Sequence, residues 1–185
     1  MKKILRTLVI LPFLFCFTIG TAMADKYVTQ EKSSLRGQTD PKKALVYIIR
    51  PSKVGSSVKS WAFLDDTFLG INKGKSYFFT HVKPGQHIIW SKMENISAIY
   101  YDFKPGQVYY FKQKVAPGFL KASTQILEVD ATKGEKWLKK AKLSVPTDKG
   151  KIKGLQLAEK HFARAQERAK AKAAKLSRKK NTRRR

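Results

Sequence analysis

Few side chains in this sequence have the type and spacing that catalysis requires. Asp65 and Asp66 could supply general acid and base groups, but neighbours on a strand face opposite sides, and no third group accompanies them. Adjacent aspartates favour a tight turn instead. The chain has no nucleophile elbow, phosphate loop, dinucleotide fingerprint or Cys/His metal spacing. We therefore expect a protein that is not an enzyme and that uses no cofactor.

The three histidines do not predict a metal site. If residues 83–86 form a turn between paired strands, the register places His81 and His87 on opposite faces of the sheet. His161 lies in the basic C-terminal region, where we expect it to be exposed. Because no third ligand accompanies either histidine, no metal is expected.

The densest aromatic cluster surrounds a second turn, at residues 104–107. Pairing across that turn sets Tyr101 opposite Tyr110 and Tyr100 opposite Phe111, so both faces of the hairpin are aromatic. One face is expected in the core, and the other is expected to pack under a helix. The alternative is a stacking surface for bases or sugar rings, formed by Tyr100, Tyr101, Tyr109 and Tyr110.

Positive charge gathers at the C-terminus. The chain has 185 residues and a formal net charge of +26, and residues 149–185, the basic tail, hold 15 basic and 2 acidic side chains. Such a run binds phosphate or carboxylate through counterion release, with little specificity. The candidate polyanion-binding residues are Lys170, Lys172, Lys175, Arg178, Lys179, Lys180, Arg183, Arg184 and Arg185.

The N-terminus predicts export. Three basic residues precede the apolar run of residues 7–21, and Ala22-Met23-Ala24 fits a small-x-small cleavage pattern, so residues 1–24 are predicted to be a cleaved signal peptide. Cys16 follows Phe15 rather than a small residue, so lipidation is not expected. A periplasmic or envelope-associated location follows, with secretion left open.

Export decides which polyanion the basic tail meets first. The expected partner is an anionic envelope surface, meaning lipopolysaccharide or phospholipid phosphates, or an acidic protein. We therefore expect a non-catalytic envelope protein whose folded domain is tethered by the tail. Nucleic-acid binding through the tail and the aromatic hairpin stays the alternative.

Short β-type runs separated by turn signals fill residues 43–130 and predict a mainly β fold, a small antiparallel β-sandwich. The strands are expected at residues 44–50, 58–64, 67–71, 75–82, 86–93, 98–103, 107–115 and 124–130. Residues 83–86 and 104–107 share the tetrapeptide Lys-Pro-Gly-Gln, which suits a type II turn. Each is expected to link paired strands.

Segments of other composition flank this β region. Residues 25–42 are polar and are expected to be a flexible leader, and residues 131–148 are expected to form a short helix, over residues 133–143, and a linker. The basic tail contains many helix formers at residues 152–177. Its narrow stripe of mostly alanine buries little apolar surface, so the tail is expected to be a solvent-exposed helix, or disordered until it binds a polyanion.

The order of these strands and turns also resembles a known family. The runs at residues 44–51, 63–70, 76–78, 82–87 and 103–111 resemble the bacterial domain-of-unknown-function family 2846, and more distantly the PEGA-type surface β-domains. The resemblance implies a small exported β-sandwich, often associated with the envelope, without an established catalytic residue. The basic tail lies outside it.

Overall fold

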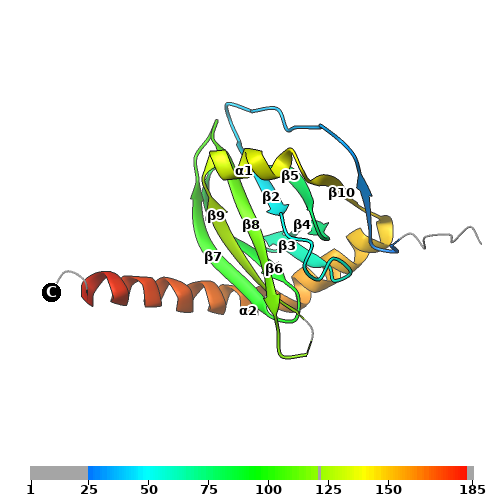
Figure 1. Ribbon diagram of the computed structural model, residues 1–185. Coiled ribbons are helices and arrows are strands. Elements are labelled where there is room, and N and C mark those ends of the chain that lie inside the picture. Colours follow the sequence, from blue (N-terminus) through cyan, green and yellow to red (C-terminus); the bar gives the residue numbers. More distant parts are fainter. Residues whose placement is uncertain (1–24, 121, 183–185) are drawn as a thin grey trace, which may run out of the picture.

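The computed structural model describes residues 25–120 and 122–182, which form two β-sheets and two helices (Figure 1). The predicted signal peptide, residues 1–24, lies outside the described residues. The fold is mainly β with a long C-terminal helix, as expected. None of the described helices is long and apolar enough to cross a membrane.

Sheet A has six strands and sheet B has four. In spatial order, sheet A consists of β1 (Val28–Glu31), β10 (Lys142–Pro146), β5 (Ser76–Val82), β2 (Ala44–Arg50), β8 (Val108–Pro117) and β9 (Ala122–Val129). Sheet B consists of β4 (Thr67–Asn72), β3 (Ser60–Leu64), β6 (Gly85–Lys92) and β7 (Ile96–Phe103). Sheet A is mixed rather than antiparallel, because β2 pairs in parallel with β8, and β10 with β5.

The two Lys-Pro-Gly-Gln turns connect the sheets, so the predicted hairpins are wrong. The first turn leads from β5 in sheet A to β6 in sheet B, and the second leads from β7 in sheet B to β8 in sheet A. Gly85 and Gly106 have φ values of 122° and 71°, in the range that glycine adopts readily. Pro105 and Gly106 form a turn, as the tetrapeptide predicts, whereas Gly85 and Gln86 already belong to β6 and only a bend precedes them. In neither case does the tetrapeptide specify whether the second strand pairs with the first.

The aspartate turn behaves as expected. Asp65 and Asp66 join β3 to β4 in an antiparallel hairpin in which Leu64 pairs with Thr67. Asp65 has a φ of 48°, a left-handed conformation that aspartate tolerates better than most residues.

Hydrophobic side chains form three clusters across the layers of the structure. The middle cluster combines inner-facing residues of both sheets, including Phe78 and Phe111 of sheet A and Ile89 and Phe103 of sheet B. The outer face of sheet A forms the second cluster with helix α1, and the outer face of sheet B forms the third with helix α2. Each helix therefore covers one sheet face that would otherwise be exposed.

Two strands lie outside the predicted β region. The segment expected to be a flexible leader contributes β1, which pairs with β10, and Val28 of β1 is buried beside Trp61. The expected linker contributes β10 after the first helix. Neither strand is strongly apolar: Val28 of β1 packs in the cluster with α2, and Leu143 of β10 packs against the cluster with α1.

Helix α1 (Ala131–Leu138) confirms the predicted short helix but ends earlier than expected. The Asp130 side chain caps its first turn by accepting a hydrogen bond from the Lys133 amide at 2.8 Å. Trp137 and Leu138 pack on the outer face of sheet A.

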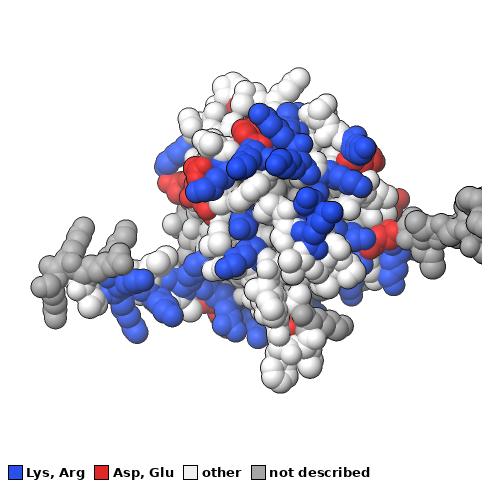
Figure 2. Space-filling model, in the orientation of Figure 1, with Lys and Arg blue, Asp and Glu red and all other residues white. Residues whose placement is uncertain are grey.

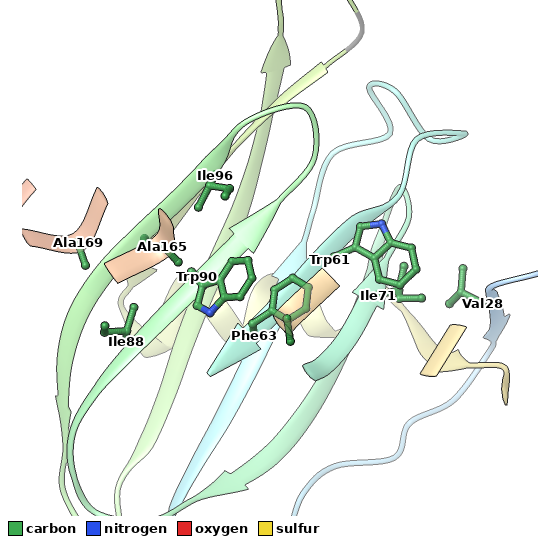
Figure 3. Close-up of a cluster of buried hydrophobic side chains, with 11 residues drawn as sticks. Val28, Trp61, Phe63, Ile71, Ile88, Trp90, Ile96, Ala165 and Ala169 are labelled. Carbon is green, nitrogen blue, oxygen red and sulfur yellow. The ribbon is translucent and has the colours of Figure 1, made fainter. Parts of the chain in front are cut away.

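Helix α2 (Asp148–Thr182) contradicts the expectation of a solvent-exposed tail. Ala158, Ala165 and Ala169 are buried against the outer face of sheet B, where Phe63 and Trp90 stack with ring centroids 3.9 Å apart (Figure 3). Most of the large side chains come from the sheet, so small residues on the helix, together with the partly buried Leu157 and Phe162, complete the packing. The last turns of α2 extend beyond the sheets (Figure 1).

Candidate anion-binding site

Docking of α2 aligns basic side chains along one flank of the helix. The basic stripe consists of Lys160, Arg164, Arg168, Lys172, Lys175 and Lys179. Successive members are three or four residues apart and therefore lie on the same side of a helix. Lys172 is half-buried and the others are exposed. The ion pairs found within the described part of the chain include no member of the stripe.

The stripe borders a groove of about 490 Å³ between α2 and the sheets. Arg168, Lys172 and Lys175 line it from the helix. The opposite wall comes from the start of β7, the start of β9 and the turn before β7. It combines the apolar Ile96 and Ala98 with polar residues, namely Asn95, Ser97, Ser123, Thr124 and Gln125. Among the described residues that line the groove, none is acidic. The guanidinium of Arg168 and the ammonium groups of Lys172 and Lys175 suit the oxygens of a phosphate.

Some of these polar groups are already engaged. The Asn95 side chain donates to the Thr124 carbonyl oxygen at 2.9 Å and accepts from the Thr124 amide at 2.7 Å. The Ser97 hydroxyl accepts from the Ile126 amide at 3.1 Å, which leaves its proton available to donate. These bonds join β9 to the β6–β7 hairpin and hold that wall of the groove in place.

A second cluster of positive groups lies farther along the same flank. Burial, followed by repulsion from Arg164 and Lys160, lowers the pKa of Lys92 on β6. Burial, followed by repulsion from Lys92, Lys160 and Arg164, lowers the pKa of His161. Burial alone lowers the pKa of Lys172 in the groove. Positive groups held this close favour a bound anion, which would relieve their mutual repulsion.

The predicted polyanion-binding residues separate in the structure. Lys172 and Lys175 line the groove, whereas Lys170 is exposed elsewhere on α2. Arg178 and Lys179 are exposed on the projecting end, and Lys180 lies in the same last turns. Arg183, Arg184 and Arg185 lie outside the described residues.

Sequence reasoning missed four members of this surface, namely Lys92, Lys160, Arg164 and Arg168. The spacing of four between residues 160, 164, 168 and 172 could have indicated a helical stripe. Lys92 could not have been found this way, because tertiary folding alone brings β6 beside α2.

The structure does not bring the four tyrosines together. Tyr100 packs on the outer face of sheet B near α2, whereas Tyr101 and Tyr109 meet between the sheets, edge to face, with ring centroids 5.3 Å apart. Tyr110 is buried under α1, stacked on Tyr47 at 5.3 Å, and its hydroxyl donates to Glu135 at 2.6 Å. The predicted pairing of Tyr101 with Tyr110 is wrong, because their strands belong to different sheets. No continuous stacking surface results within the described chain.

The histidines and the aspartate turn have structural contacts. His81 Nε2 lies 2.7 Å from the Gln38 carbonyl oxygen, and His87 Nδ1 lies 2.6 Å from Asp65 Oδ2. Asp65 also accepts hydrogen bonds from the Ile88 amide and, at its backbone oxygen, from the Trp90 indole. Asp65 thereby anchors the β3–β4 turn to β6. In the described residues, no three His, Cys, Asp or Glu side chains are grouped to hold a metal ion.

Arg50 is the strongest internal candidate for binding an anion, because it is fully buried and has no carboxylate partner among the described residues. Its guanidinium instead donates to the carbonyl oxygens of Val54, Gly55 and Val58 at 2.9, 2.6 and 2.5 Å. Burial lowers the pKa of Arg50 to about 10. These bonds shape the loop at residues 51–59, so Arg50 serves the fold.

Comparison with other proteins finds a relative that is itself uncharacterised. The chain is 25% identical to an uncharacterised protein of Haemophilus influenzae over 133 residues, which cover 70% of this chain and 76% of that protein. No protein-family model matches the sequence, and no solved structure matches it. The candidate site therefore depends on the geometry of the chain itself.

Proposed function

We propose that this chain is an exported, non-catalytic protein of the cell envelope that binds an anionic surface through the basic stripe of α2. The observation that carries the proposal is the docking of α2, which aligns six basic side chains beside a groove without acidic residues among its described lining. The predicted signal peptide and the resemblance to domain-of-unknown-function family 2846 support export. In this proposal the two sheets form a β-sandwich held at the envelope.

The docked helix changes how such binding works. A flexible basic tail would lose conformational entropy when it ordered on a surface, whereas residues 158–169 of α2 are already packed against sheet B. Binding would then release counterions from a preformed row of charges and weaken steeply as salt rises. The surface would be the phosphates of phospholipid or lipopolysaccharide.

Charge substitution tests the proposal better than truncation. Removal of α2 would expose the aromatic face formed by Trp61, Phe63 and Trp90, so a truncated chain would lose fold as well as charge. Arg168→Gln, Lys175→Gln, Arg178→Gln and Lys179→Gln remove four exposed charges from α2. Lys136→Gln, Lys139→Gln, Lys140→Gln and Lys142→Gln remove four exposed charges on or just after α1 and form the matched control.

The measurement is co-sedimentation of residues 25–185, which contain every described element, with phosphatidylglycerol vesicles over a range of salt. Each Lys or Arg near an anionic bilayer contributes about 1 kcal/mol, so the α2 variant should lose affinity by up to about 1,000-fold at low salt. The dependence on salt should also become shallower. Equal losses in both variants would mean that net charge alone causes binding, and would refute the proposed site.

Nucleic-acid binding makes a different prediction in the same assay. The separation of Tyr100, Tyr101, Tyr109 and Tyr110 leaves no stacking platform in the described structure, so only phosphate contacts by the stripe would remain. Single-stranded and duplex DNA should then compete with vesicles according to their phosphate content. Preferential competition by single strands would instead favour base stacking.

A further inference from the structure

The turn between β8 and β9 carries the most exposed large hydrophobic side chains of the described residues. Phe119 and Leu120, here called the hydrophobic tip, are 95% and 80% exposed. The turn projects beyond both sheets, and in the space-filling view its described residues form a mostly white knob at the edge of the molecule (Figures 1 and 2). Exposed apolar groups on a projection often mark a binding surface.

Contacts at its base hold the hydrophobic tip in place. Strands β8 and β9 remain paired up to Pro117 and Ala122. The Leu120 amide donates to Glu94 Oε1 at 2.9 Å, and the Glu94 amide donates to the Ala122 carbonyl oxygen at 3.2 Å. Gly118 permits this approach, because a Cβ there would lie 2.2 Å from Glu94 Oε2. Strand pairing and hydrogen bonds at its base therefore hold the hydrophobic tip in its projecting position.

The hydrophobic tip and the basic stripe lie at the same end of the sheets. Ser123 and Gln125, which follow the tip on β9, line the groove opposite Arg168 and Lys175. Leu120 borders a second pocket together with Lys92, which belongs to the positive cluster at the other end of the stripe.

We propose that the hydrophobic tip inserts into the interfacial region of an anionic phospholipid bilayer while the basic stripe lies against its phosphates. This inference depends on the proposed function and identifies the anionic surface as a lipid bilayer. An apolar group that projects beside basic groups suits the boundary between headgroups and acyl chains, where both kinds of contact form at once. Soluble polyphosphate, which offers no apolar phase, would bind to the basic stripe without contacting the hydrophobic tip.

The first test separates the tip from the stripe. Phe119→Ser with Leu120→Ser removes the tip, and Leu35→Ser with Val54→Ser removes two exposed apolar side chains elsewhere as the control. All four side chains are exposed, so thermal unfolding of residues 25–185 should be unchanged. Binding is measured to vesicles of phosphatidylcholine with phosphatidylglycerol, and to soluble polyphosphate.

We expect the tip variant to lose at least about tenfold in vesicle affinity, since burial of two apolar side chains contributes to binding. Its affinity for polyphosphate should not change, and the control should bind both as the unaltered chain does. Vesicle binding by the tip variant at full affinity would overturn the insertion while leaving the proposed function intact. Full vesicle affinity in the four-charge α2 variant would instead overturn the proposed function.

A second test reports insertion directly. Residues 25–185 contain no cysteine, so Phe119→Cys provides one attachment site for an environment-sensitive fluorophore, and Val54→Cys provides the control. Anionic vesicles should shift the emission of the residue 119 probe to shorter wavelength and leave the residue 54 probe unchanged. An unchanged emission at residue 119 while the protein is bound would overturn insertion.

Discussion

Helices α1 and α2 cover the two outer sheet faces in opposite ways. On sheet A, α1 supplies large side chains, Trp137 and Leu138. On sheet B, the strands supply most of the bulk through Trp61, Phe63 and Trp90. Helix α2 supplies buried alanine and glycine, with the partly buried Leu157 and Phe162 beside them. Both arrangements fill the space between helix and sheet, but the fully buried contacts of α2 are mostly alanine, which stands out less in a sequence than Trp137 does.

This difference explains why the role of α2 is hard to predict. Buried volume is shared between two surfaces, so a helix that packs on aromatic strands can make much of its contact through small residues. A narrow alanine stripe is therefore compatible with a long docked interface. The opposite flank of α2 stays free for charge, which lets one helix cover the core and present the basic stripe.

The largest effect is expected from a charge placed in the α2 interface. Ala165 is fully buried, so Ala165→Asp should lower the free energy of unfolding by about 3–5 kcal/mol, the usual cost of an uncompensated buried charge. Ala163 lies two residues earlier and is exposed, so Ala163→Asp is the matched control. Chemical denaturation measures both. Similar small effects of the two substitutions would show that α2 is not docked in solution.

A cavity under α1 should have the next largest effect. Leu138 is buried, and Leu138→Ala should lower the free energy of unfolding by about 2–5 kcal/mol. The neighbouring Lys139 is exposed and provides the control, since Lys139→Ala should change the free energy of unfolding by less than about 0.5 kcal/mol. A loss below about 1 kcal/mol for Leu138→Ala would mean that α1 contributes little to covering sheet A.

The glycines of α2 test how closely it approaches sheet B. A Cβ at Gly150 would lie 2.1 Å from the Tyr27 carbonyl oxygen, and one at Gly154 would lie 2.4 Å from the Phe68 ring. A ring can turn aside more easily than a strand backbone, so Gly150→Ala should destabilise more, by about 1–3 kcal/mol. Helix propensity alone would make both substitutions stabilising by about 1 kcal/mol. That outcome, read from thermal unfolding, would contradict close packing.

The smallest effect concerns pH. Burial and the charges of Lys92, Lys160 and Arg164 lower the pKa of His161, so the unfolded chain binds a proton here more readily than the folded chain does. Stability should therefore rise as pH increases from the lowered folded pKa through about 6.5, the unfolded value. His161→Gln should make this rise shallower, and His81→Gln, away from the stripe, should not. Identical pH profiles for all three chains would exclude His161 as the cause.

The sequence alone predicted much of the local structure. The strand expected at residues 44–50 coincides with β2, and the aspartate turn is where it was placed. Alternating side chains and turn residues act over a few positions, so a linear pattern records them. The positive charge of the last 37 residues is also a property of composition, and Lys172 and Lys175 of the candidate groove were among the residues it indicated.

Tertiary structure decided which strands pair and what α2 does. The Lys-Pro-Gly-Gln turns lead from one sheet to the other, so Tyr101 and Tyr109 meet across the interior instead of along a hairpin. The position of α2 against Trp90, and of Lys92 beside Arg164, depends on contacts between residues far apart in the chain. Such contacts depend on the shapes of two surfaces formed by distant parts of the chain. The residue pattern of one segment does not indicate the shape of the surface that it packs against.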